Sequence, residues 1–258
     1  PAELVAEAAR LRLSAIALTD HNTVAGLPEF LAAGQGSAVE TIPGCEFSAD
    51  YQGVELHIVG LFIQPEHYEA VTALLAQAQQ EKERSNLALV AALKENGYEV
   101  DYAQICSGYA GQINRAHFAA ALIEKGYFET MQQAFKGPLS AKHGFYQPPK
   151  RIDAYDCIRF IKSIGAVAIL AHPFLSLEEE ALRAFLPQAV EAGLDAMEVA
   201  YSKYSPETTA AAFAVADAFG LQYSGGSDFH GGNKPDIALG SGRGDLKVPL
   251  AWLQSLKK

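Results

Sequence analysis

Short apolar runs alternate with helical patterns along most of the chain. The runs with strand character cover residues 15–18, 40–45, 54–63, 167–170, 197–200 and 221–224. Between them, apolar residues recur at helical spacing, as in an amphipathic helix that packs on a sheet. Strands that alternate with helices predict an α/β fold with a largely parallel sheet.

One long segment departs from this alternation. Residues 66–150 show mainly helical patterns, beginning with a long amphipathic helix that starts at Tyr68 and ends at Gly97. We therefore expect a barrel-like domain formed by residues 1–65 and 151–258, with a helical insertion at residues 66–150.

The chain opens with a helix rather than a strand. In "PAELVAEAARLRL", Pro1 suits a first helical turn, and Leu4, Ala8 and Leu11 form one apolar stripe. No initiator methionine precedes this helix, so we expect natural sequence upstream of Pro1. A targeting signal in that upstream sequence is not excluded.

Composition narrows the class of protein. With 258 residues, 49% of them hydrophobic, the chain can bury the core of one domain with an insertion. A formal net charge of -10 argues against an extended nucleic-acid surface, although a local basic pocket for phosphate stays open. Cys45, Cys106 and Cys157 lie far apart, which indicates no disulfide framework and fits the cytoplasm. No apolar run reaches the length of about eighteen residues that a membrane span needs.

Imidazoles and carboxylates follow the ends of several predicted strands. These residues are Asp20, His21, Glu46, His172, Asp228 and His230. The carboxyl ends of strands in parallel α/β folds meet at one face, so we expect these side chains to converge, together with His57 from the third strand. Such a set without thiols is typical of ligands for zinc, manganese or iron.

Each residue also has an ordinary structural interpretation. A single histidine within a strand, such as His57, is more often a hydrogen-bonded core residue than a ligand. His172 precedes a proline and could simply end a strand, and Asp20 could cap a helix that begins near Thr23. Their joint placement at strand ends favours the metal site.

A second group of candidates lies in the helical insertion. In "GQINRAHFAAALIEKGY", Asn114 is a plausible N-cap, which places Arg115 and His117 in the first helical turn. Free backbone donors and the positive helix end suit a phosphate there. Lys142 in "LSAKHGFY" is a further phosphate-binding candidate. The alternative is that Arg115 pairs with a surface acid and His117 packs internally.

Five motifs together carry a family resemblance. "LTDHNT", "PGCEFS", "LHIVG", "LAHP" and "GSDFH", in this order, resemble the PHP (polymerase and histidinol phosphatase) superfamily of metal-dependent phosphoesterases. With "NRAHF" in the insertion, the chain is most similar to bacterial enzymes that hydrolyse nucleoside 3',5'-bisphosphates and degrade short RNA from its 5' end. The resemblance implies a distorted, TIM-like (β/α)7 barrel whose helical insertion contributes to the substrate pocket.

The resemblance also implies the metals and their ligands. It implies two or three divalent ions, with manganese first and zinc, iron or magnesium as alternatives. The matching ligand positions are His21, Glu46, His57, His172, Asp228 and His230, with Asp20 outside the ligand set. Arg115 and His117 match positions that contact phosphate. The family's opening strand, with an HxH pair and an acidic residue, is absent here, so we expect one metal position to be weakened.

The expected reaction is hydrolysis of a terminal phosphate on a nucleotide or short oligonucleotide by a metal-activated water. Arg115 would hold the phosphate with its guanidinium fork, while His117 either contacts the phosphate or protonates the leaving oxygen. Two alternatives stay open, a non-catalytic PHP module and a metal-dependent hydrolase of carbon–nitrogen bonds. The latter usually carries a metal-bridging lysine on a strand, which this sequence lacks.

Overall fold

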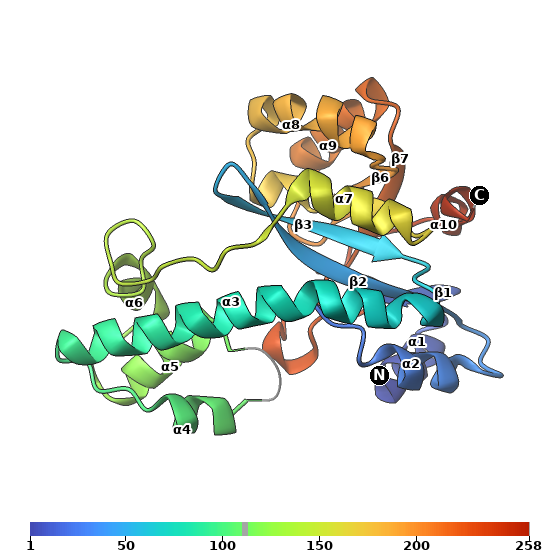
Figure 1. Cartoon of the computed structure of the whole chain (residues 1–258). Coiled ribbons are helices and arrows are strands. Elements are labelled where there is room, and N and C mark those ends of the chain that lie inside the picture. The colour runs from blue at the N-terminus through green and yellow to red at the C-terminus, as the bar shows by residue number, and fades with distance from the viewer. Residues whose placement is uncertain (110–112, 258) are drawn as a thin grey trace. The chain divides into compact units, whose positions relative to one another are not determined.

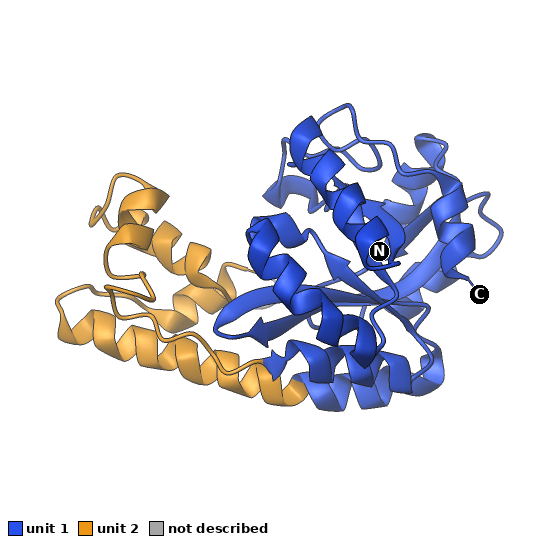
Figure 2. Ribbon diagram, turned by 90° about the horizontal axis from the view of Figure 1, so that it is seen from above, with its two compact units in different colours: residues 1–75, 152–258 blue, residues 76–151 orange. Residues whose placement is uncertain are grey.

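The computed structural model describes residues 1–109 and 113–257, which form two compact units (Figure 2). Unit 1 comprises Pro1–Leu75 and Ile152–Lys258, and unit 2 comprises Ala76–Arg151. The boundary lies inside a helix rather than at its start at Tyr68, because Val71 and Leu75 pack into the core of unit 1.

Unit 1 contains a mixed sheet (Figure 1). Its strands are β1 (Ala15–Leu18), β2 (Glu40–Tyr51), β3 (Val54–Leu61), β4 (Ile152–Asp153), β5 (Val167–Ala171), β6 (Ala196–Tyr201) and β7 (Gln222–Gly226). The order is β1-β2-β3-β5-β6-β7, with β4 beside β2. The α/β class is as expected, but β3 runs antiparallel to both β2 and β5, so the sheet is less parallel than the sequence pattern predicts.

The antiparallel pairing of β2 and β3 has a local cause. Gln52 and Gly53 both have positive φ, at 52° and 85°, as in the two-residue turns that connect hairpins. This turn prolongs β2 to Tyr51, so Glu46 lies in the middle of a strand. The expectation that Glu46 follows the end of its strand was therefore wrong.

Helices pack against this sheet, most of them on its outer face, while Leu256 of the last helix joins an apolar cluster on the inner face. They are α1 (Ala2–Arg10), α2 (Leu27–Gly34), α7 (Ala154–Ser163), α8 (Glu179–Ala192), α9 (Pro206–Ala218) and α10 (Leu250–Leu256), with short 3-10 helices at Pro65–His67, Pro173–Leu175 and Gly231–Asn233. Phe47 and Met197 from the sheet join Ile158, Phe185 and Val215 from the helices in one buried cluster. Burial of this apolar layer is the main stabilising contribution to unit 1.

The inner face of the sheet has its own small apolar cluster. It includes Ile42, Val59, Ile169, Ala171 and Ala196. Among the described residues the sheet is open between β1 and β7, which both line a cavity of about 780 Å³. The observed sheet is thus a curved, open one, and it positions side chains toward a single concave side.

Unit 2 is helical. Its elements are α3 (Tyr68–Glu95), which begins in unit 1, followed by α4 (Tyr102–Ser107), α5 (Arg115–Glu124) and α6 (Met131–Lys136). Leu89, Leu93, Phe118, Leu122 and Leu139 form a separate buried core. The long helix predicted from Tyr68 is confirmed. Across the part of the chain that the structure describes, no helix is both long and apolar enough to cross a membrane.

Candidate metal centre

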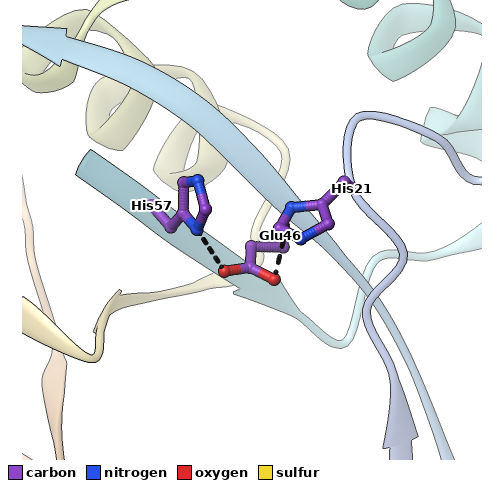
Figure 3. A group of neighbouring side chains, drawn as sticks. All are labelled: His21, Glu46 and His57. Atoms are coloured by element: carbon purple, nitrogen blue, oxygen red, sulfur yellow. Dashed lines mark ion pairs between the residues drawn. The ribbon is translucent and has the colours of Figure 1, made fainter. Parts of the chain in front are cut away.

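The carboxylate of Glu46 lies among three imidazoles on the inner face of the sheet. Its Oε1 is 2.7 Å from His57 Nδ1 and 3.0 Å from His172 Nε2, and its Oε2 is 3.5 Å from His21 Nδ1. Figure 3 shows His21 and His57 turned toward the two carboxylate oxygens from opposite sides. One potential ligand atom from each of His21, Glu46 and His57 lies within 4.8 Å of the other two.

Strand register brings these residues together. His57 on β3 pairs with Ser48 on β2 and with Ala171 on β5, so His172 follows directly beside His57. His21 comes just after β1 and forms a parallel bridge with Glu46. Side chains alternate between the two faces along a strand. Glu46 therefore shares the inner face with Ile42, which lies four residues earlier on β2.

Asp228 and His230 extend the group from the segment after β7. The rings of His230 and His21 have centroids 5.7 Å apart. His230 Nδ1 lies 2.9 Å from the main-chain oxygen of Asp228, so this contact engages Nδ1 and not Nε2. Asp228 Oδ2 accepts hydrogen bonds from Tyr201 Oη at 2.7 Å and Lys234 Nζ at 2.6 Å, while its Oδ1 lies 3.2 Å from His230 Nδ1.

The electrostatics of the group reflect its crowding. Burial would raise the pKa of Glu46, but hydrogen bonds from His172 and His57 outweigh it and hold this pKa well below its usual range. Burial lowers the pKa of His57, yet the contacts with Glu46 and Glu55 raise it to about 9. Burial is the main reason that the pKa of His21 is lowered. The negative charge of the Glu46 carboxylate is thus balanced by the positive charge of the His57 imidazole.

The donor set fits a divalent metal. His57 Nδ1 and His172 Nε2 are only 3.4 Å apart and both face the same carboxylate oxygen. Converging imidazole nitrogens around a carboxylate are the ligands that zinc, manganese and iron take in proteins. His57 Nδ1 and His172 Nε2 contact side chains of this group, unlike core histidines bonded only to main chain.

Three residues of this region were not singled out from the sequence. They are Glu198, Tyr201 and Lys234. Glu198 follows Ala196 by two positions on β6, so it shares the inner face and lines the cavity. Burial raises its pKa to about 7. An acidic side chain at an inner-facing register was a usable signal for Glu198.

Asp20 contacts the group through its main chain. Its carbonyl oxygen accepts the N–H of Glu46 at 3.2 Å, which continues the pairing of β1 with β2. The alternative that Asp20 caps a helix near Thr23 was wrong, because the next helix begins at Leu27 with Gly26 as N-cap.

Arg115, His117 and Lys142 belong to unit 2. Asn114 is the N-cap of α5, as predicted, and its side chain accepts the N–H of Ala116 at 2.9 Å. His117 Nδ1 accepts the N–H of Asn114 at 3.2 Å, so this imidazole completes a capping box. Lys142 is exposed in the loop after α6.

Aromatic rings surround Arg115. Its Cζ lies 4.4 Å from the ring centre of Tyr146 and 5.4 Å from that of Phe135. Its Nη1 donates to the main-chain oxygen of Leu139 at 3.3 Å. A guanidinium stacked in this way is held in place without losing its positive charge. This placement differs from the alternative in which Arg115 pairs with a surface acid.

Comparison with known proteins identifies the family. The profile of the PHP domain matches residues 1–144. The 5'-3' exoribonuclease Rnm of Salmonella typhimurium is 34% identical over 237 residues, which cover 89% of this chain and 80% of that protein. The chain therefore belongs to the PHP domain family, and the resemblance seen in its motifs is confirmed.

Other relatives differ in the phosphate esters that their names specify. A phosphoribosyl 1,2-cyclic phosphate 1,2-diphosphodiesterase of Eggerthella lenta is 30% identical, over 92% of this chain and 91% of that protein. A 3',5'-nucleoside bisphosphate phosphatase of Chromobacterium violaceum is 27% identical, over 89% of this chain and 81% of that protein.

Solved structures agree with this family assignment. A protein of Bifidobacterium adolescentis, assigned as a metal-dependent phosphoesterase, superposes with a TM-score of 0.81 at 27% identity, over 99% of this chain and 89% of that chain. A protein of Chromobacterium violaceum described as an amidohydrolase, with bound sulfate and no metal, gives a TM-score of 0.79 at 28% identity, over 90% and 83%.

Proposed function

We propose that this protein is a metal-dependent phosphoesterase that hydrolyses a terminal phosphate of a nucleotide. A nucleoside 3',5'-bisphosphate is the first candidate substrate, and the 5' end of short RNA is the second. The observation that carries the proposal is the position of Glu46 among His21, His57 and His172. The names of the exoribonuclease and bisphosphate phosphatase relatives support the substrate class.

In this proposal six side chains hold two or three divalent ions, with manganese as the first candidate. They are His21, Glu46, His57, His172, Asp228 and His230. Such ions, when bound, supply Lewis acidity that activates water near neutral pH and offsets phosphate charge. The chain's own part is to orient the ligands, as Tyr201 and Lys234 do by occupying Oδ2 of Asp228.

Arg115 and His117 are the proposed phosphate-binding residues, with Lys142 as a further contact. Arg115 offers a guanidinium fork, which matches two oxygens of a terminal phosphate. Because His117 Nδ1 accepts a main-chain N–H, its proton resides on Nε2, and burial with the nearby Lys82 charge lowers its pKa. A neutral His117 donates a hydrogen bond to phosphate, which favours binding over protonation of the leaving group.

The complete barrel is also part of the proposal. β1 and β7 each pair on one side among the described residues, and both line the same cavity as the metal-site residues. A further strand between them would satisfy both edges and close the sheet. The family's HxH strand is the proposed occupant of this gap.

The decisive assay measures phosphate release after chelation and reloading with manganese, zinc, iron or magnesium. The panel contains a nucleoside 3',5'-bisphosphate, a 5'-phosphorylated short RNA, a 1,2-cyclic ribose phosphate and a simple amide. We expect metal-dependent release from the first two substrates. Turnover of the cyclic phosphate alone would change the substrate class, and turnover of the amide alone would refute the phosphoesterase. No release with any metal would favour a non-catalytic module.

A further inference from the structure

Glu198 lies on the inner face of β6 beside the candidate metal ligands. It lines the same cavity as Glu46, His172 and Asp228. Its Oε2 accepts the main-chain N–H of His172 at 2.8 Å. The carboxylate therefore contacts the backbone of a candidate ligand rather than its imidazole.

The backbone of His172 needs such a partner. Its φ of 29° and ψ of 50° lie in the left-handed region of backbone conformation, which residues other than glycine rarely adopt. A strained residue keeps this conformation only where its surroundings fix it. The hydrogen bond from the His172 N–H to Glu198 Oε2 acts on the strained residue itself.

This backbone conformation determines the direction in which the His172 ring points. With the backbone held, His172 Nε2 lies 3.0 Å from Glu46 Oε1 and 3.4 Å from His57 Nδ1. If the backbone relaxed toward the common regions, the ring would leave this position because its direction follows φ and ψ. Glu198 thus acts on the site through His172.

The pairing of β6 with β7 is irregular beside the Glu198 carboxylate. The pairing of β6 with β7 shifts register between Glu198 and Ala200, and such bulges re-aim side chains. On one side of the shift Glu198 reaches His172, and on the other Tyr201 reaches Asp228. A Cβ on Gly226 would lie 3.3 Å from Glu198 Oε1, so a glycine there leaves the carboxylate room.

We propose that Glu198 is a positioning residue, which fixes the strained backbone of His172 through its hydrogen-bond acceptor and so presents the His172 imidazole to the metal site. This role rests on the proposed metal-dependent function. It predicts that the acceptor oxygen, rather than the negative charge, is the property of Glu198 that matters.

Two variants separate the acceptor from the charge. Glu198→Gln keeps an oxygen acceptor at the same reach and removes the charge, whereas Glu198→Asp keeps the charge and withdraws the oxygen by one methylene. Glu66→Ala, which removes an exposed carboxylate of unit 1, is the control. Thermal unfolding of all variants shows whether each is folded.

The first readout is hydrogen exchange of the His172 amide in the metal-free protein, and the second is manganese affinity by calorimetry. We expect Glu198→Asp to exchange faster at His172 and to bind manganese roughly tenfold more weakly, as loss of an outer partner typically does. Glu198→Gln should stay within about threefold of the unaltered protein in both readouts.

The opposite ranking, with Glu198→Asp unaffected and Glu198→Gln impaired, would overturn the proposal in favour of a charge or ligand role. Unchanged exchange at His172 in both variants would also overturn it. If the unaltered protein binds no metal, the proposed function fails, while the exchange of the His172 amide still tests the positioning role by itself.

Discussion

His57 Nδ1 lies 2.7 Å from Glu46 Oε1, and the two residues face each other from neighbouring antiparallel strands. This contact is part of a site in which the Glu46 carboxylate lies beside the imidazoles of three histidines. Any divalent ion bound there must share the oxygens of Glu46 with His21, His57 and His172, so Glu46 is the residue on which metal binding should depend most.

Replacement of Glu46 by glutamine should abolish tight metal binding. The amide has nearly the shape of the carboxylate but lacks its charge, so the imidazoles stay in place without an anionic ligand. We expect manganese affinity to fall by more than the roughly tenfold seen for loss of an outer partner, with phosphate release falling alike. Elemental analysis after dialysis measures the bound metal. Retention of metal at the level of a Glu66→Gln control would remove Glu46 from the ligands.

Replacement of Arg115 by alanine should separate phosphate recognition from metal binding. We expect unchanged metal content and a loss of transition-state stabilisation of about 1.5 to 3 kcal/mol, as for a charge-assisted contact. Lysine should restore little, because it lacks the planar fork and the stacking on Tyr146. Steady-state kinetics provide the measurement, with Arg84→Ala on α3 as a matched control. Kinetics equal to those of the control would exclude a role for Arg115.

His117 offers a test that separates capping from phosphate binding. Glutamine at this position can still reach the N–H of Asn114, since glutamine is a standard third residue of a capping box. We expect His117→Gln to keep the unfolding temperature and lose phosphate turnover. His117→Ala should lose turnover and, with the cap weakened, about 0.5 to 2 kcal/mol of stability. Full turnover in His117→Gln would show that the residue is structural.

The three cysteines should differ sharply in reactivity. Burial raises the pKa of the Cys45 thiol to about 12 and raises that of Cys157 further, whereas Cys106 is exposed. The reactive species is the thiolate, so we expect a thiol reagent at neutral pH to modify Cys106 alone in the folded protein. All three should react after denaturation. Rapid reaction of Cys45 or Cys157 under native conditions would contradict their burial in the core.

The proposed strand between β1 and β7 can be tested by fusing the opening strand of the PHP family, with its HxH pair, before Pro1. We expect the longer protein to bind more metal per chain and to release phosphate faster than residues 1–258, because the strand would add ligands and close the sheet. Trp252 lines the cavity and is the sole tryptophan of the chain, so its fluorescence should change when the added strand occupies the cavity. Equal metal stoichiometry and activity at both lengths would show that the six ligands suffice.

Local pattern determined a good part of this protein. The strands at Ala15–Leu18 and Val167–Ala171, the long helix from Tyr68 and the N-cap at Asn114 follow from short-range periodicity and capping chemistry. The motifs around His21, His172 and Asp228 also pointed to the PHP family, because each motif is a contiguous stretch of sequence.

Tertiary structure decided the rest. Pairing of His57 with Ala171 joins segments far apart in the chain, and this register, together with that of β2 and β3, sets His172 beside Glu46. Local pattern carries no information on such a register, since a shift by one residue would turn every side chain to the other face. The contact of Glu198 with the His172 backbone likewise exists only because β5 and β6 pair and Glu198 shares the inner face of β6 with Ala196.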